Sequence, residues 1–78
     1  MDKVDDDYQP TFPQAADLTD AEVRLIKRSL SAFKNKAHRK PLVTLENKLK
    51  DKYQIKSDMT TVKFMYALLR DNTYYVNR

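Results

Sequence analysis

The chain has 78 residues, enough for one small domain that buries little more than about 60% of its extended surface. It contains no cysteine and no glycine, which excludes disulfide scaffolds, thiolate metal sites and glycine-rich phosphate-binding loops. Its net charge of +4 conceals an asymmetry, because residues 1–20 carry six acids and one lysine, whereas residues 21–78 carry 14 basic residues and five acids. A basic domain behind an acidic segment favours attraction to nucleic acid or to an acidic protein surface.

Residues 1–17 hold an acidic run and two prolines and show no hydrophobic periodicity. This composition predicts a disordered acidic arm, followed by a basic domain over residues 18–78. Tyr8 and Phe12 are the two aromatic side chains of the arm. They either pin the arm to the domain or form a short motif for a partner.

The clearest signal in the chain is the start of a first helix, predicted over residues 20–36. Thr19 and Glu22 have the spacing of a capping box, and Leu18 and Val23 that of a hydrophobic staple. Apolar residues then recur at helical spacing and form one stripe: Val23, Ile26, Leu30, Phe33 and Ala37. Asn35 is the expected left-handed residue at the end of this helix.

A second helix is predicted over residues 41–53. Lys40 precedes a proline and is therefore expected outside the helix, whereas Pro41 suits a first helical turn. One face of this helix is apolar, through Leu42, Leu45, Leu49 and Tyr53.

A third helix is predicted over residues 58–71, with Ser57 or Asp58 as its cap. Its apolar face is wide, comprising Met59, Val62, Phe64, Met65, Tyr66, Leu68 and Leu69, and leaves a narrow polar strip of Thr60, Lys63, Ala67 and Arg70. A helix this apolar lies between neighbouring elements or pairs with a second copy of the chain. Asn72 is the expected stop, and the β-prone residues 73–76 predict a short extended tail. The result is an all-α domain of three helices.

The sequence offers little that supports catalysis or cofactor binding. His38 is the single histidine and has no carboxylate near it in sequence, and residues 5–7 lack the spacing of a calcium loop. We therefore expect a non-enzymatic protein with no metal and no cofactor. No apolar run approaches membrane-spanning length, and the expectation is a soluble cytoplasmic protein without membrane contact.

From Thr44 onward, the predicted order of helix, turn, helix and β-prone tail resembles a helix-turn-helix with the first strand of a wing. In that interpretation Thr60, Thr61 and Lys63 begin the recognition helix. Lys50 and Gln54 stand where the motif usually has small residues, and the turn is about two residues longer than the motif allows. These departures, with the narrow polar strip, favour a central core helix instead.

The predicted role is that of a small regulatory or accessory protein that contacts DNA or RNA through a basic surface. Its predicted contact residues are Lys34, Lys36, Arg39, Lys40, Lys48, Lys50, Lys52, Lys56, Lys63 and Arg70. The alternative is an adaptor or inhibitor that binds an acidic site on a larger enzyme. In composition the chain resembles compact phage-encoded accessory proteins that act on host enzymes. A homodimer through the third helix is a further prediction.

Overall fold

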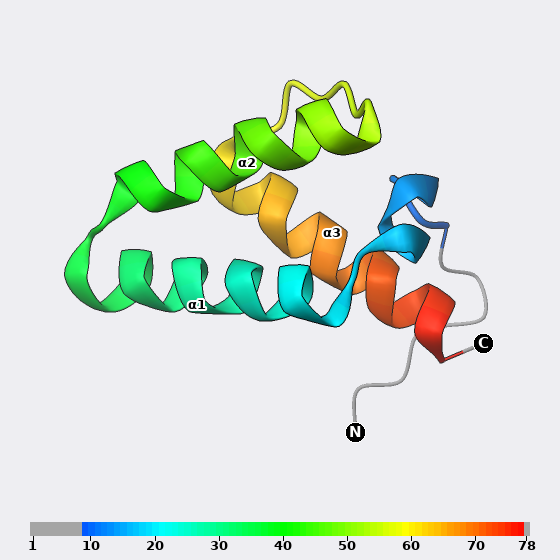
Figure 1. Cartoon of the computed structure of the whole chain (residues 1–78), viewed down its shortest axis with the longest axis horizontal. Coiled ribbons are helices and arrows are strands. Elements are labelled where there is room, and N and C mark those ends of the chain that lie inside the picture. The colour runs from blue at the N-terminus through cyan, green and yellow to red at the C-terminus, as the bar shows by residue number, and fades with distance from the viewer. Residues whose placement is uncertain (1–8, 78) are drawn as a thin grey trace.

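The structure is a computed structural model that describes residues 9–77, and every described element is helical (Figure 1). A short 3-10 helix, η1 (Pro13–Asp17), precedes α1 (Asp20–Lys36), α2 (Arg39–Tyr53) and α3 (Thr61–Val76). α1 and α2 form an antiparallel pair, and α3 packs against both of them as well as against η1. The predicted all-α fold of three helices is confirmed.

The first helix has the predicted bounds because its start is determined locally. The Glu22 N–H donates to Thr19 Oγ1 at 3.1 Å, and the Thr19 N–H donates to Glu22 Oε1 at 2.8 Å, which completes the capping box. At the other end, Ala37 and not Asn35 adopts the left-handed conformation, with φ of 57°. The helix continues through Asn35, whose side chain donates to Ser31 Oγ at 3.2 Å.

The second helix begins two residues earlier than predicted, at Arg39, and ends at Tyr53 as expected. Pro41 then occupies the third helical position. A backbone N–H in the first turn of a helix has no acceptor within the helix, so a proline there removes no helical hydrogen bond. Lys40 is therefore helical, contrary to the prediction. Gln54 closes the helix in the left-handed conformation, with φ of 54°.

The third helix begins and ends later than predicted. Ser57 Oγ accepts the Met59 N–H at 3.1 Å and so caps a local turn, and the helix itself starts at Thr61. At the other end, the predicted extended tail is wrong, because α3 continues through Val76. Asn72 is not a stop: it is buried within the helix, and its amide donates to the Ala15 carbonyl at 2.9 Å. Tertiary packing thus overrides the β propensity of these residues.

The predicted disordered arm needs correction in its second half. Phe12 is only 6% exposed, its ring lies 5.3 Å from that of Phe64, and its N–H donates to Asp71 Oδ2 at 2.7 Å. Ala15 of η1 is also fully buried. Of the two alternatives for Phe12, the structure shows the one in which its side chain holds the N-terminal segment against the domain. Tyr8 and the acidic run lie outside the described residues.

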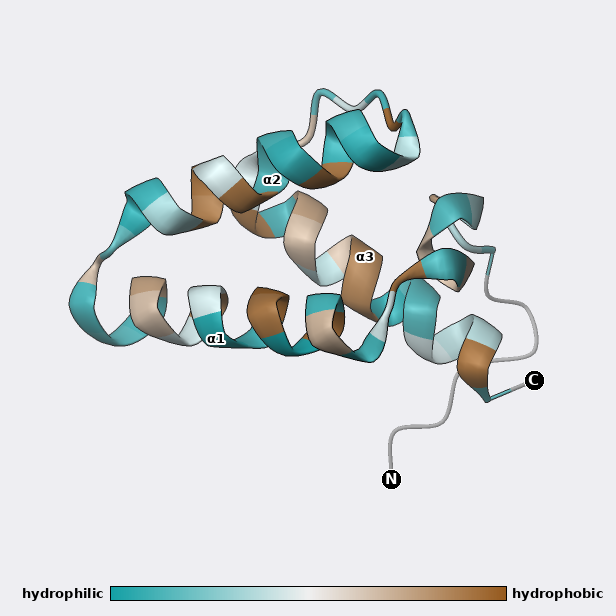
Figure 2. Ribbon diagram, viewed as in Figure 1, coloured by the Kyte–Doolittle hydropathy of each residue, from teal (hydrophilic) through white to brown (hydrophobic). Residues whose placement is uncertain are grey.

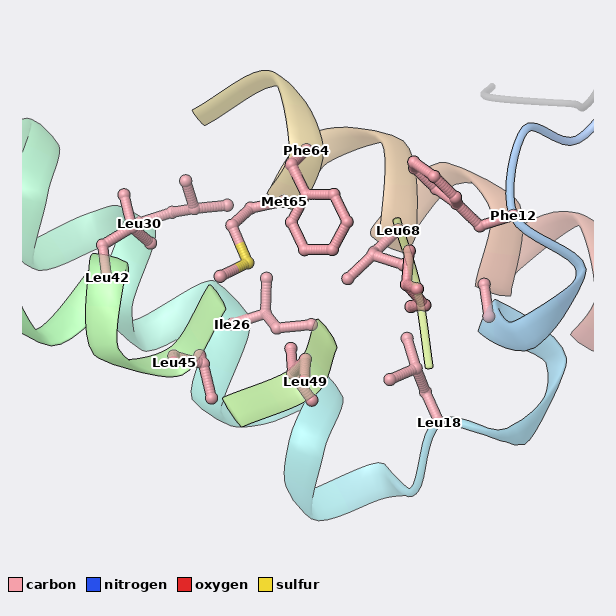
Figure 3. Packing of buried hydrophobic residues seen from close by; sticks show 12 residues of the cluster. Phe12, Leu18, Ile26, Leu30, Leu42, Leu45, Leu49, Phe64, Met65 and Leu68 are labelled. Carbon is pink, nitrogen blue, oxygen red and sulfur yellow. The ribbon is translucent and has the colours of Figure 1, made fainter. Parts of the chain in front are cut away.

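The core lies where α1, α2, α3 and η1 meet, and Figure 2 shows hydrophobic stretches of the three α-helices alternating with hydrophilic ones. Figure 3 shows Phe64, Met65 and Leu68 of α3 packed over Ile26 of α1 and Leu49 of α2. Phe12 and Leu18 close the same cluster from the N-terminal side. Phe64, Met65 and Leu68, the buried part of the apolar face of α3, are therefore covered within one chain. Self-association through α3 stays a prediction.

Candidate nucleic-acid interface

The fold divides the predicted basic surface into three groups. The first group lies around the α1–α2 connector and contains Lys34, Lys36, Arg39 and Lys40. The second lies on α2 and the loop after it and contains Lys48, Lys50, Lys52 and Lys56. The third lies on α3 and contains Lys63 and Arg70. Nine of these ten residues are exposed, and Lys50 is half-buried. Exposure alone therefore leaves most of the predicted contact residues available.

Lys50 is engaged within the fold. Its ammonium lies 3.0 Å from Glu46 Oε2, donates to the Ser57 carbonyl at 3.2 Å and stands 5.0 Å from the centre of the Phe64 ring. Glu46 also accepts a hydrogen bond from the Thr61 hydroxyl at 2.7 Å. These contacts tie α2 to the start of α3. Thr61, expected at the start of a recognition helix, is thus half-buried against α2.

Lys52 takes part in a polar cluster that joins the start of α1 to the end of α2. Its ammonium lies 2.5 Å from Glu22 Oε2, and the Tyr53 hydroxyl donates to Glu22 Oε1. We call Glu22, Lys52 and Tyr53 the Glu22 clasp. Burial by itself would raise the pKa of Glu22, but hydrogen bonds from Lys52, the Thr19 N–H and Tyr53 outweigh it and lower the pKa from 4.5 to about 2. Glu22 thus stays ionised and holds Lys52 within the clasp.

On another part of the surface, α3 borders a groove of about 560 Å³. Lys63, Tyr66 and Arg70 line it along the helix, and Thr11 lines it from the N-terminal segment. The residues at 63, 66 and 70 lie within about 100° of arc on an α-helix, so the three side chains share one face. This face includes two of the predicted contact residues.

A second groove, of about 360 Å³, lies between α1 and α3. Lys27 and Lys34 line it from α1, where they lie about two helical turns apart on the same side, and Tyr66 and Leu69 line it from α3. Tyr66 and Leu69 thus belong to both grooves. Among the residues that the structure describes, no carboxylate lines either groove. We call the surface made of Lys27, Lys34, Lys63, Tyr66 and Arg70 the Tyr66 face.

Two residues of the Tyr66 face were not predicted as contact residues. Lys27 was not assigned a role from the sequence. Tyr66 was placed on the apolar face of the predicted third helix, but it is 54% exposed. The spacing of Tyr66 at three residues after Lys63 and four before Arg70 is the signal that places it on the polar strip. With Tyr66 outside, the free face of α3 is wider than the sequence suggested.

The described residues contain no candidate metal site and no candidate membrane-spanning helix. Within residues 9–77, no group of three or more histidine, aspartate or glutamate residues is placed to hold a metal ion. No helix in this range has the length and apolar character needed to cross a membrane. His38 is exposed ahead of α2, without a capping hydrogen bond from its side chain.

The whole chain, residues 1–78, matches a protein-family model described as a domain of unknown function, DUF8484. No curated protein and no solved structure matches it.

Proposed function

We propose that this chain, which belongs to the DUF8484 family, is a non-enzymatic accessory protein that binds nucleic acid through the Tyr66 face. The observation that carries the proposal is that, among residues 9–77, four basic side chains and no carboxylate line the two adjoining grooves. Phosphates are the ligands that such a surface complements best, and their neutralisation releases condensed counterions.

The charges of three of these side chains are available to a ligand. Within the part of the chain that the structure describes, Lys27, Lys34 and Lys63 make no ion pair or hydrogen bond through their ammonium groups. This separates them from Lys50 and Lys52, which already have carboxylate partners. A lysine without an internal partner loses no existing interaction when it contacts a phosphate, and therefore contributes more to binding.

The connector cations extend this surface. Lys34 lies in the last turn of α1 and lines the α1–α3 groove, and Lys36, Arg39 and Lys40 follow within the next six residues. All of them are exposed. A bound strand that leaves the groove at Lys34 would meet further positive charge there, which favours a ligand longer than one nucleotide.

The test is a salt titration of binding to labelled mixed-sequence DNA and RNA. We expect the logarithm of the binding constant to fall linearly with the logarithm of salt concentration. Replacing Lys34 or Lys63 with glutamine should lower the slope by about one each and weaken all sequences about equally. Lys48→Gln is the matched control, because Lys48 is exposed but lines neither groove.

Two results would contradict the proposal. The first is the absence of binding to any nucleic acid at low salt, which would favour an acidic protein partner for the same cations. The second is an equal loss of slope in Lys48→Gln and Lys63→Gln, which would place the contact elsewhere on the surface. Circular dichroism of each variant shows whether the helices are retained.

A further inference from the structure

We propose that the Tyr66 face takes single-stranded nucleic acid, with an unpaired base stacked on the Tyr66 ring and the flanking phosphates on the lysines of the two grooves. This inference rests on the proposed function and specifies its ligand. It depends on three observations: the position of Tyr66, the apolar floor of the grooves and the distribution of charge on both sides of the ring.

Tyr66 is an aromatic side chain left on the surface of a helix whose neighbouring residues are buried. Phe64, Met65 and Leu68 are fully buried, whereas Tyr66 is 54% exposed. Within residues 9–77 its hydroxyl makes no hydrogen bond and its ring packs on no other ring. The Tyr66 side chain therefore makes no hydrogen bond or ring contact within these residues, and its exposed side is accessible to a ligand. Stacking of a base on such a ring contributes about 1–3 kcal/mol.

The grooves on either side of the ring also contain apolar side chains. Met59, Ala67 and Leu69 contribute to the larger groove, and Leu30 with Leu69 to the smaller. A duplex presents sugars and phosphates to a protein surface and hides the faces of its bases within the stack, so these apolar side chains would have no partner. An unpaired base has two apolar faces and polar edges, which match an apolar floor with a basic rim.

Basic side chains lie on both sides of the ring. Lys63 and Arg70 flank Tyr66 along α3, and Lys27 with Lys34 faces it from α1 across the smaller groove. A strand whose base stacks on Tyr66 carries a phosphate on each side of that nucleotide, so each phosphate meets a lysine of one groove. Single-strand sites of other proteins combine these two parts, a basic groove for the backbone and an aromatic platform for the bases.

The experiment compares three labelled probes of equal length by fluorescence anisotropy. They are an oligothymidylate of about 12 nucleotides, within the ~4–16 nucleotides of known single-strand sites, an abasic deoxyribose-phosphate chain and a duplex. For Tyr66→Ala we expect the Kd for oligothymidylate to rise about 5- to 140-fold, the equivalent of the stacking energy at tenfold per 1.4 kcal/mol. The Kd for the abasic chain should stay unchanged, because it offers phosphates without bases.

Two further variants make the result specific to the ring. Tyr66→Phe keeps the ring and should retain the affinity of the wild type for oligothymidylate. Leu25→Ala is the matched control, since Leu25 is an exposed large apolar residue that lines neither groove. It should leave all three Kd values unchanged.

The possible outcomes separate this inference from the proposed function. If wild type binds but Tyr66→Ala leaves the Kd for oligothymidylate unchanged, the stacking inference fails and phosphate binding stands. Tighter binding of the duplex than of oligothymidylate would also overturn the inference alone. If no probe binds at low salt while polyglutamate does, both proposals fail in favour of an acidic protein partner.

Discussion

Replacing Asp71 with alanine should lower the free energy of unfolding by about 2–3 kcal/mol, because it releases the N-terminal segment from α3. Asp71 is fully buried, and its Oδ2 accepts the Phe12 N–H at 2.7 Å. Without this carboxylate, a buried backbone N–H keeps no acceptor, and the side chain of Phe12 loses the contact that holds its backbone beside Phe64.

The magnitude follows from the type of bond that is lost. A hydrogen bond to a charged group contributes about 1.5–3 kcal/mol, and leaving its buried partner unsatisfied adds to the cost. For a domain of this size, a change of 1 kcal/mol shifts Tm by roughly 4–8 °C, so the expected decrease is roughly 8–24 °C. Asp71→Asn keeps an acceptor oxygen without the charge and should cost less than the alanine variant.

Thermal and urea unfolding followed by circular dichroism measure the loss, and amide hydrogen exchange locates it. The Phe12 N–H should exchange faster in Asp71→Ala relative to the amides of α1. Asp58→Ala is the control, since Asp58 is an exposed aspartate with no hydrogen bond to any residue in the range 9–77. A loss below about 0.5 kcal/mol in Asp71→Ala, the range of ordinary surface changes, would refute the reasoning, as would an unchanged exchange rate at Phe12.

Three further predictions concern stability. Because the folded pKa of Glu22 lies at about 2, below its ordinary 4.5, its contribution is present above pH 4.5 and is lost as the pH falls toward 2. The exposure of Lys52 to solvent keeps this contribution small. Urea unfolding across this pH range should show the decline in wild type but not in Glu22→Gln. Thr19→Ala should cost about 1 kcal/mol in urea unfolding through loss of the capping box, and a cost near zero would mean that packing alone fixes the start of α1. Ala37→Gly should raise Tm and add about 0.5–1 kcal/mol to the free energy of unfolding, because glycine adopts the left-handed conformation of residue 37 without the strain of an alanine. The control Ala32→Gly lies within α1 and should lower Tm. A lower free energy of unfolding in Ala37→Gly would show that the alanine is not strained.

The first two helices were predicted well because their signals are local. The capping box joins residues three apart, and the stripe at Ile26 and Leu30 repeats within one helix. The end of α2 at Tyr53 was also predicted from the spacing of its apolar residues. Such features depend on neighbours within a turn or two, so the amino-acid order alone contains them.

The candidate site was predicted only in part for the same reason. Lys34, Lys63 and Arg70 were identified from charge, which is a property of composition. Their assembly with Lys27 around Tyr66 requires the packing of α1 beside α3, which no local pattern encodes. Lys50 had the same sequence signal as its neighbours, and only its contacts with Glu46 and Phe64 show that it belongs to the fold.

The amino-acid sequence by itself determined the all-helical class, the beginning of the first helix and the excess of positive charge after residue 20. The tertiary structure decided which apolar residues are covered and where the chain stops being helical. Phe12 meets Asp71 across 59 residues and Asn72 meets Ala15 across 57, and these bonds order the N-terminal segment and keep α3 helical past Asn72. Contacts between residues so far apart form only when the helices pack together, and their energy then exceeds the local preferences of the segments that they join.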